Sequence, residues 1–376
     1  MIYLDNAATT FPKPRRVLEA VLECLARYCG NPGRGAHPLS LVCAEKVYDC
    51  RTALSSLFGV GAPERVLFTS NTTHALNLAI KGLFGAGDHV LISELEHNAV
   101  RRPLCRLQRE LGVRFESFPV VGLTPAQILS ELARRLRPQT KGVICAHASN
   151  ICSISLPITE IGALCHEKRL LFLVDAAQSA GHLPIDMANM HISALAVPAH
   201  KGLYGIQGAG VLALGEGISP APLLEGGSGS DSLAEEMPTL PPERYEAGTL
   251  ATPAIVGLLD GIQFLQERGL ENIAAHEKVL FCAARERLES IPAIEIYARD
   301  REGPVLLFNH AHLSPQEVAQ HLAREGICVR AGLHCAPLAH EALGTAPRGA
   351  VRLGFGAFNT VSELDALWRT LRELNG

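Results

Sequence analysis

The stretch Arg65–Phe84, "RVLFTSNTTHALNLAIKGLF", contains a strand followed directly by a helix. Its first half is a short apolar run of the kind found in buried strands. In its second half the apolar residues recur at the spacing of one helical face, and these residues are Ala75, Leu76, Ala79, Ile80 and Leu83. The stretch therefore predicts one β-α unit whose helix packs on a sheet.

The same alternation continues from about residue 65 to residue 214. Strand-like runs such as "HVLISE", "KGVICAHAS" and "LLFLVDAA" are separated by amphipathic stretches such as "NAVRRPLCRLQREL". This pattern predicts a mainly parallel sheet with helices on both faces. A segment rich in Gly, Ser and Pro begins at Glu225, and a second α+β region starts at Ile255. We therefore expect an α/β protein with a large domain and a smaller α+β domain.

Composition and charge exclude several classes of protein. The 376 residues carry 34 basic and 38 acidic side chains, a net charge of −4, whereas a surface for nucleic acid or anionic membranes needs a basic excess. No apolar run approaches the roughly 20 residues that span a bilayer. The N-terminal "MIYLDNAATTFPKP" lacks the apolar core of a signal peptide, and the eleven cysteines include no CxxC pair. We expect a cytoplasmic protein with no metal site and no nucleic-acid or membrane partner.

Polar residues gather at the ends of the predicted strands, where parallel α/β sheets place their working groups. Asn71, Thr72 and Thr73 open a helix, and the free N–H groups of a helix N-terminus with nearby hydroxyls suit a phosphate. A simple helix cap is the structural alternative. The other strand ends carry Glu96, His97 and Asn98, then Asn150, then Asp175 and Gln178, and finally His200 and Lys201.

Together these groups are the parts needed to hold pyridoxal 5′-phosphate (PLP). The amine of Lys201 can bond to the cofactor's aldehyde, and a carboxylate such as Asp175 keeps the pyridine nitrogen protonated. A lysine that is partly desolvated beside a strand is more easily deprotonated, as a nucleophile requires. The glycines that follow it in "HKGLYGIQGAG" allow the backbone to approach a ligand closely.

The chain resembles the class V aminotransferase family, in its cysteine desulfurase and selenocysteine lyase branch. The motifs that carry the resemblance run in order along nearly the whole chain: "YLDNAATTFPKP", "NPGRGAHPLS", "TSNTTHALN", "EHNAVRRPL", "VDAAQSAG", "HKGLYGIQGAGVL", "YEAGTLATP", "RAGLHCAPLAH" and "VRLGFGAFNT". The resemblance implies the type I (aspartate aminotransferase-like) fold of PLP-dependent transferases. It places the large PLP-binding domain at residues 15–254, and the small domain, which carries a catalytic cysteine loop, at residues 1–14 and 255–376.

The resemblance also implies roles for individual residues. Lys201 would bond to the cofactor, and Asp175 would pair with its pyridine nitrogen. Gln178 would donate a hydrogen bond to the ring oxygen of the cofactor, and His97 would stack on the face of the ring as a catalytic residue. The phosphate would be held by Thr72, Thr73 and His200, and by Thr249 reaching from the other subunit of a homodimer.

One cysteine differs from the other ten. Cys335 lies in "RAGLHCAPLAH", whose glycine and proline predict an accessible loop, and positive neighbours such as Arg330 and His334 would favour its thiolate. Loop packing and a surface charge are the structural alternatives for those two neighbours. By the resemblance, Cys335 is the nucleophile that takes sulfur from the substrate. Arg352, with Asn150 beside it, is the expected anchor for an amino-acid carboxylate, because a guanidinium fork suits a planar carboxylate. Arg330 would guide either the carboxylate or the thiolate.

The expected reaction converts L-cysteine to L-alanine and leaves a persulfide on Cys335, from which a sulfur-acceptor protein would take the sulfur. L-Selenocysteine is an equally suitable substrate for the same site. One alternative is a C–S lyase or epimerase that uses the same PLP site on another amino acid or thiol conjugate. A further alternative is a non-catalytic sulfur-transfer partner, but such a protein would have lost Lys201 or Asp175, and both are present.

Several positions depart from the family pattern. Pro198 and Ala199 precede His200 where a hydroxyl residue and glycine are usual. The other departures are Ser153, Ala251 and Gly354. These departures predict weaker phosphate binding and a specialised or relaxed substrate site, and they leave the predicted fold unchanged.

Overall fold

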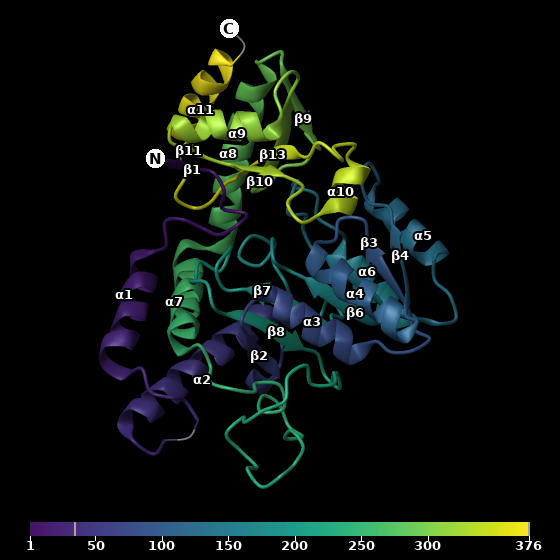
Figure 1. Ribbon diagram of the computed structural model, residues 1–376, viewed down its shortest axis with the longest axis vertical. Coiled ribbons are helices and arrows are strands. Elements are labelled where there is room, and N and C mark those ends of the chain that lie inside the picture. Colours follow the sequence, from purple (N-terminus) through teal and green to yellow (C-terminus); the bar gives the residue numbers. More distant parts are fainter. Residues whose placement is uncertain (34, 375–376) are drawn as a thin grey trace.

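A seven-stranded sheet forms the centre of the larger part of the molecule (Figure 1). The computed structural model describes residues 1–33 and 35–374. The strand order is β2-β8-β7-β6-β5-β3-β4; neighbours from β7 to β4 pair in parallel, whereas β8 is antiparallel to both of its neighbours. The strands are β2 (Val66–Thr69), β3 (His89–Ser93), β4 (Arg114–Phe118), β5 (Thr140–Ala146), β6 (Leu171–Asp175), β7 (Ala194–Pro198) and β8 (Gly210–Leu214). The prediction of a mainly parallel sheet is confirmed.

Helices cover both faces of this sheet. Successive residues of a strand point to opposite faces, so Val90 and Ile92 belong to one buried cluster and Leu91 to another. The helices α3 (Thr72–Leu83) and α4 (Asn98–Leu111) supply the cluster around Val90. The cluster around Leu91 is supplied by α2 (Pro38–Phe58), α5 (Pro125–Arg134), α6 (Ile158–Glu167) and α7 (Thr252–Arg268).

The strand-to-helix junction that the stretch Arg65–Phe84 predicts is confirmed. β2 ends at Thr69, and α3 begins at Thr72 after a cap in which the side-chain oxygen of Asn71 accepts a hydrogen bond from the backbone N–H of His74 at 2.9 Å. Because Asn71 occupies this capping position with its own side chain, the other free N–H groups of the first turn stay available to a ligand.

A second, four-stranded antiparallel sheet forms the smaller α+β part, with strand order β12-β13-β10-β9. Its strands are β9 (Ile294–Tyr297), β10 (Val305–His310), β12 (Arg330–Gly332) and β13 (Ala350–Gly354). Its helices are α8 (Leu270–Glu289), α9 (Pro315–Arg324), α10 (Pro337–Ala342) and α11 (Val361–Glu373). The N-terminal β1 (Ile2–Tyr3) pairs in parallel with β11 (Ile327–Cys328), so the two ends of the chain lie in the same part of the molecule (Figure 1).

The smaller part has a buried cluster of its own, although Leu307 and Ala350 of its sheet belong to the cluster around Leu91. Leu4, Phe308 and Leu367 belong to this third cluster, which draws on β1, β10 and α11 regions that are far apart in the sequence. Helix α7 instead buries Ile255 and Leu258 against the large sheet. The domain limits at residues 14 and 254 stay a prediction. None of the helices in the described ranges has the length and apolar character needed to cross a bilayer.

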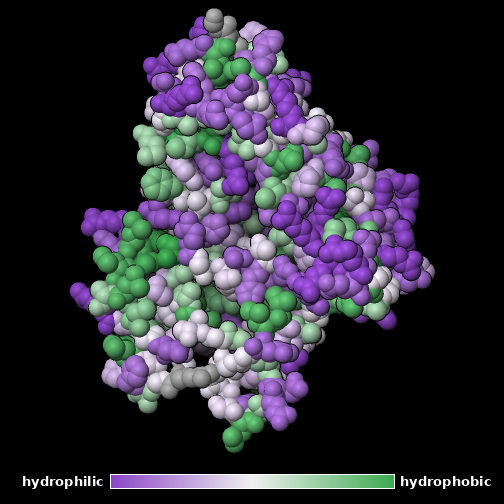
Figure 2. All heavy atoms as spheres, viewed as in Figure 1, coloured by the Kyte–Doolittle hydropathy of each residue, from purple (hydrophilic) through white to green (hydrophobic). Residues whose placement is uncertain are grey.

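An apolar strip remains exposed on the N-terminal helices. It lies on α1 (Arg15–Glu23), on the π-helix η1 (Cys24–Tyr28) that continues α1, and on α2; a 3₁₀ turn, η2 (Pro63–Arg65), leads from α2 to β2. Leu22 is 67% exposed and Leu41 is 58% exposed, and the strip near α1 is visible as the green area at the left of Figure 2. Contiguous exposed apolar surface of this kind marks a contact with another molecule.

The Gly- and Ser-rich segment after Glu225 has no helix or strand up to Ala251 and extends away from the sheet (Figure 1). A buried ion pair between Glu246 and Arg51 anchors its end. The second carboxylate oxygen of Glu246 accepts the backbone N–H of Phe68 at 2.6 Å, and Arg51 also donates to the carbonyl of Val66. The pair therefore ties this segment to both α2 and the edge strand β2.

We expect Glu246→Ala to lower the free energy of unfolding by about 3–5 kcal/mol, because it leaves the buried Arg51 guanidinium without its counter-charge. The measurement is urea unfolding of the purified chain followed by far-UV circular dichroism. Glu19→Ala is the matched control, since Glu19 pairs with Arg15 on an exposed helix surface and its loss should leave the unfolding midpoint almost unchanged. Equal midpoints for the two variants would contradict the anchoring role of Glu246.

Candidate active site

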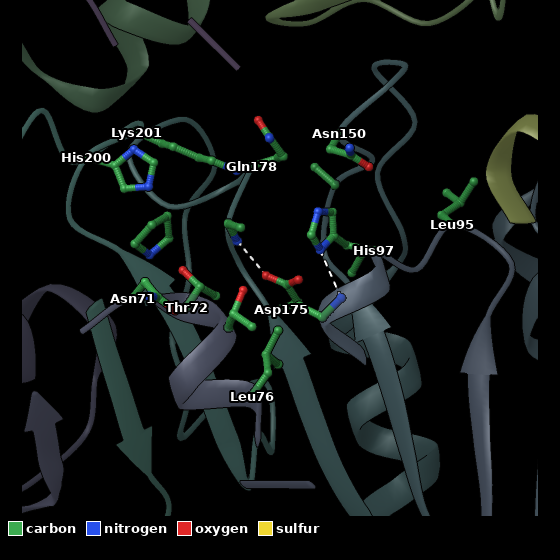
Figure 3. Close-up of a pocket in the computed structure, with 16 residues that line it drawn as sticks. Asn71, Thr72, Leu76, Leu95, His97, Asn150, Asp175, Gln178, His200 and Lys201 are labelled. Carbon is green, nitrogen blue, oxygen red and sulfur yellow. Dashed lines mark hydrogen bonds between the residues drawn. The ribbon is translucent and has the colours of Figure 1, made fainter. Parts of the chain in front are cut away.

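A pocket opens at the carboxyl ends of the parallel strands, where the polar residues singled out in the sequence converge (Figure 3). The predicted site residues that line it are Thr72, Thr73, His97, Asn150, Asp175, Gln178, His200 and Lys201. The others, Thr249, Arg330, Cys335 and Arg352, lie outside its lining. Because the strands are parallel, residues more than a hundred positions apart in sequence reach the same edge of the sheet.

One side of the pocket is the N-terminus of α3. The hydroxyl oxygen of Thr72 is buried there and has no hydrogen-bond partner among the described residues, and the same holds for Nδ1 of His200. Gly210 of β8 lies so close that a Cβ atom on it would be 2.4 Å from the carbonyl carbon of Asn71. Buried polar atoms almost always find partners, so this cradle has the chemistry of a site for a ligand phosphate.

Asp175 is the last residue of β6, and Lys201 lies three residues after the end of the neighbouring strand β7. Desolvation is the largest influence on Lys201 and lowers its pKa to about 8, although the carboxylate of Asp175 acts in the opposite direction. Asp175 is buried, and one of its oxygens accepts the backbone N–H of Ala177 at 2.9 Å. Burial nevertheless raises the pKa of Asp175. The amine of Lys201 is therefore far closer to its neutral, nucleophilic form at physiological pH than a solvated lysine.

His97 caps α4 and also lines the pocket. Its Nδ1 accepts the backbone N–H of Ala99 at 3.0 Å, so the ring proton belongs on Nε2. Burial and the positive charge of Lys201 lower the pKa of His97 to about 4. His97 is therefore a neutral ring beside Lys201, suited to packing on a flat ligand and to donating from Nε2.

Gln178 is held by the N-terminal segment of the chain. Its side-chain amide donates to the carbonyl of Ala7 at 2.9 Å. The same segment supplies Lys13, a residue that reasoning from the sequence missed. The amine of Lys13 donates to the backbone carbonyl of His200 at 2.9 Å, and burial lowers its pKa to about 8. The signal was present in "YLDNAATTFPKP", but sequence patterning does not show that this motif packs behind Lys201.

Glu96 is a second group to which the sequence assigned no role. It is completely buried next to the pocket, and one of its oxygens accepts the backbone N–H of Ala146 at 2.7 Å. Desolvation, aided by the charge of Asp175, raises the pKa of Glu96 to about 8. Since Ala146 pairs with Asp175 across β5 and β6, Glu96 braces the strand ends that carry Asp175.

The Cys335 segment lies against the rim of the pocket. The side-chain amide of Asn150 donates to the carbonyl of His334 at 2.7 Å, and the backbone N–H of Asn98 donates to the carbonyl of Cys335 at 2.7 Å. His334 and Cys335 both have left-handed backbones, with φ of 49° and 58°. Cys335 is exposed and free, as the glycine and proline around it predict.

His334 does not supply the positive charge that its place in the sequence indicated. The ring is buried, with Nδ1 3.2 Å from Nε2 of His340 and Nε2 3.3 Å from the carbonyl oxygen of Arg330. Burial lowers the pKa of His334 to about 3, so the ring is neutral at physiological pH. The expectation that His334 helps to stabilise a thiolate is therefore wrong, and only the exposed Arg330 can supply a positive charge from this segment.

Arg352 is buried beside the pocket with its guanidinium already paired. One nitrogen donates to the carboxylate of Asp5 at 2.8 Å and another to the backbone carbonyl of Asn150 at 2.9 Å. Its Nε has no partner among the described residues. A substrate carboxylate would therefore meet a guanidinium whose Nε is free and whose charge is shared with Asp5, a residue that the sequence reasoning did not single out.

Thr249 is exposed in a different hollow, which it shares with Tyr48 and Arg51. It does not line the pocket of Lys201 in the same chain. Its assignment to the site of a partner subunit stays a prediction.

Two departures from the family pattern have structural reasons. A Cβ atom on Gly354 would lie 2.6 Å from the backbone nitrogen of Ala7, so a serine would displace the N-terminal segment. The hydroxyl of Ser153 makes two hydrogen bonds with Val305 of β10. It donates to the backbone carbonyl at 2.7 Å and accepts from the backbone N–H at 3.2 Å. Nothing in the structure explains Ala251.

Comparisons with known proteins agree with the family that the sequence motifs predicted. Residues 2–367 match the family model Aminotransferase class-V. A probable cysteine desulfurase of Pyrococcus abyssi is 33% identical over 385 residues, which cover 100% of this chain and 94% of that protein. One from Mycolicibacterium paratuberculosis is also 33% identical over 384 residues and 100% of this chain, which spans 55% of its length. The apo structure of a cysteine desulfurase from Thermococcus onnurineus NA1 matches with a TM-score of 0.89 and 31% identity, over 99% of this chain and 94% of that one. The predicted type I fold is confirmed.

We expect Gly210→Ala to weaken the binding of PLP about tenfold or more, because the added methyl group would push the start of α3 out of the phosphate cradle. The measurement is titration of the cofactor-free chain with PLP, followed by absorbance. Gly85→Ala is the control, since no described heavy atom lies within 4 Å of a Cβ at that position apart from its chain neighbours. Unchanged affinity in Gly210→Ala would show that the phosphate binds elsewhere.

Proposed function

Because the chain belongs to the class V aminotransferase family, we propose that it is a PLP-dependent cysteine desulfurase that converts L-cysteine to L-alanine and receives the sulfur on Cys335 as a persulfide. One observation carries the proposal. Lys201 and Asp175 share a pocket with the unpartnered polar atoms of Thr72 and His200, and the side chain of Asn150 holds the Cys335 segment against that pocket.

The residues of the pocket fit PLP. The hydroxyl of Thr72, Nδ1 of His200 and the first N–H groups of α3 offer donors to a phosphate, and the two side-chain atoms lack other partners among the described residues. Asp175 offers a carboxylate to the pyridine N–H, and Lys201 offers an amine to the aldehyde. When bound, PLP supplies an electron sink for the negative charge that develops at the α-carbon of an amino acid.

Lys201 is the base of the proposed reaction. Its amine takes the α-proton of L-cysteine, and a pKa of about 8 leaves a useful fraction of the amine neutral at physiological pH while keeping it basic enough to accept a proton. The neutral ring of His97 packs beside it without competing for that proton, since the pKa of His97 is about 4.

Cys335 accepts the sulfur. Its Sγ attacks the sulfur of the substrate, the bond between that sulfur and the substrate's β-carbon breaks, and the carbon takes up a proton to become the methyl group of alanine. Cysteine thiol and substrate thus give persulfide and alanine with no external oxidant. The left-handed turn at His334 and Cys335, fixed by Asn150 and Asn98, presents the thiol to solvent at the rim of the pocket.

Arg352 orients the substrate in this proposal. Its free Nε and the nitrogen now paired with Asp5 together form the fork that a carboxylate requires. The substrate carboxylate would replace Asp5 as the counter-charge, so Asp5 keeps the buried Arg352 compensated between turnovers. Asn150 contributes by holding Arg352 through its backbone carbonyl.

The proposed enzyme is a homodimer. The exposed apolar strip on α1 and α2, with Leu22 and Leu41, supports burial against a second copy of the chain. Thr249 is exposed in a hollow beside α2 and would reach the phosphate bound by the partner. The same pocket would accept L-selenocysteine as a substrate. The desulfurase and selenocysteine lyase activities differ in whether alanine release requires Cys335.

We expect Cys335→Ala to reduce alanine release from L-cysteine by about a thousandfold or more, because the sulfur loses its acceptor. The measurement is alanine formed by the PLP-loaded enzyme with a thiol reductant, with L-selenocysteine tested in parallel. Cys29→Ala, which removes another exposed free cysteine, is the control and should keep the full rate. Persistent turnover of L-cysteine by Cys335→Ala would favour the C–S lyase alternative, and turnover of L-selenocysteine alone would identify a lyase.

The lowered pKa of Lys201 predicts how the cofactor-free chain reacts with PLP at different pH. Only the neutral amine attacks the aldehyde, so the rate of attachment should rise with pH up to about 8 and then level off. A lysine at the ordinary value of 10.5 would keep gaining rate through pH 9 and 10. The measurement is stopped-flow absorbance after mixing with PLP. Lys201→Ala should show no attachment at any pH, and the same absorbance change on mixing as in the unaltered chain would overturn the assignment of Lys201.

A further inference from the structure

A second hollow opens on the solvent side of Cys335. It is lined by residues of α4 and of the Cys335 segment, among them Arg101, Arg102, Cys105, Arg330, Leu333 and Cys335. Its volume of about 580 Å³ is in the range of small-molecule sites, about 300–1,000 Å³. Within residues 1–33 and 35–374, no aspartate or glutamate lines it. Figure 2 shows strongly hydrophilic residues gathered over the region of α4.

The hollow carries positive charge without counter-charges. The side chains of Arg101, Arg102 and Arg330 have no hydrogen bond or ion pair to another residue in the described part of the chain, whereas Arg106, one turn further along α4, pairs with Glu110 at 2.8 Å. Three unpaired guanidinium groups around one concave surface attract anions more strongly than the same charges spread over a convex face. This local excess contrasts with the net negative charge of the whole chain, −4.

The charges are placed along a line that begins at Cys335. The carbonyl of Cys335 accepts the N–H of Asn98, the first residue of α4, at 2.7 Å. Arg101, Arg102 and Cys105 follow Asn98 at three, four and seven positions, so they lie on the same face of the helix. The exposed thiol of Cys335 therefore stands at one end of a basic strip, with Arg330 across the hollow.

Resting on the proposed function, we infer that this hollow binds a small thiol carrying carboxylate groups, which takes the sulfur from Cys335. Guanidinium groups bind carboxylates through paired N–H donors, and no other charge in the lining opposes such a ligand. A molecule of this class can place its thiol at Cys335 while its carboxylates contact Arg101 and Arg102. A neutral or cationic thiol would gain nothing from these residues.

The transfer needs no further reactant. The thiolate of the small molecule attacks the outer sulfur of the Cys335 persulfide and forms a new S–S bond to it. The bond between that sulfur and Sγ of Cys335 breaks, and the electron pair stays on Sγ as a thiolate. The step starts from the small-molecule thiolate and the Cys335 persulfide, and it ends with the small-molecule persulfide and the Cys335 thiolate. Charge, protons and oxidation level therefore balance. The positive charge of Arg330 beside the departing thiolate favours the step.

The first experiment tests the anion site without turnover. The full chain is alkylated with iodoacetate or with iodoacetamide, which differ mainly in charge, and the rate at each cysteine is measured by peptide mass spectrometry. The exposed Cys29 serves as the internal reference. We expect the iodoacetate-to-iodoacetamide rate ratio at Cys335 to exceed that at Cys29 about tenfold at low salt. The ratio at Cys335 should fall toward that at Cys29 in about 0.5 M salt, because exposed charges are screened there.

The variants assign the effect to named residues. Arg101→Glu and Arg102→Glu should each reduce the normalised ratio at Cys335 several-fold, because each reverses a charge in the hollow. Arg109→Glu makes the same change on α4 outside the lining, and it should leave the ratio unchanged. Equal ratios at Cys335 and Cys29, or a ratio that none of the variants moves, would overturn the inference.

The second experiment tests the acceptor itself. Alanine release from L-cysteine by the PLP-loaded enzyme is measured with mercaptosuccinate, which carries two carboxylates, and with the neutral thioglycerol. We expect kcat/KM to favour mercaptosuccinate, and the preference to fall about tenfold in Arg101→Glu or Arg102→Glu but not in Arg109→Glu. Alanine release with no preference between the thiols would overturn the inference and leave the proposed function standing. No alanine with either thiol would overturn the proposed function and the acceptor role with it.

Discussion

The candidate site depends on the desolvation of charged groups at the carboxyl edge of the large sheet. Asp175 ends β6 and Lys201 follows the neighbouring strand β7, and each favours the charged form of the other. Burial still dominates for both, because it lowers the pKa of Lys201 to about 8 and raises that of Asp175. The site therefore holds an amine that is close to neutral and a carboxyl whose burial favours pairing with a ligand cation. A more solvated edge would leave Lys201 fully protonated and without a nucleophilic role.

The N-terminal segment joins the two sheets at this edge. Asp5 pairs with Arg352 of the smaller part, the carbonyl of Ala7 orients Gln178, and Lys13 holds the carbonyl of His200. These contacts are directional and mostly buried, so they fix the geometry of the pocket more strictly than apolar packing alone. The pocket is consequently a product of the whole chain: its floor comes from one sheet, and its rim is set by residues that belong to the other.

The rim also carries backbone strain. Left-handed backbones at His334 and Cys335 cost on the order of 1–3 kcal/mol each. Hydrogen bonds from Asn150 and Asn98 hold this turn, and His340 supports it from the buried side. Strain that is retained in this way keeps the thiol of Cys335 exposed beside two hollows of different character. One is lined by the groups that fit PLP, and the other is open and basic.

Local patterning determined the fold class and most of the pocket. The alternation around Arg65–Phe84 was sufficient for the parallel sheet, and parallel strands bring their ends together, so Asp175 and Lys201 could be placed in one site before any contact was known. Only the tertiary structure decided which charges are compensated. It paired Arg352 with Asp5 and buried His334 as a neutral ring. It also left the arginines beside Cys335 without partners among the residues that the structure describes. The physical reason is that pairing and burial depend on contacts between segments distant in sequence, and the spacing of residues along the chain carries no record of those contacts.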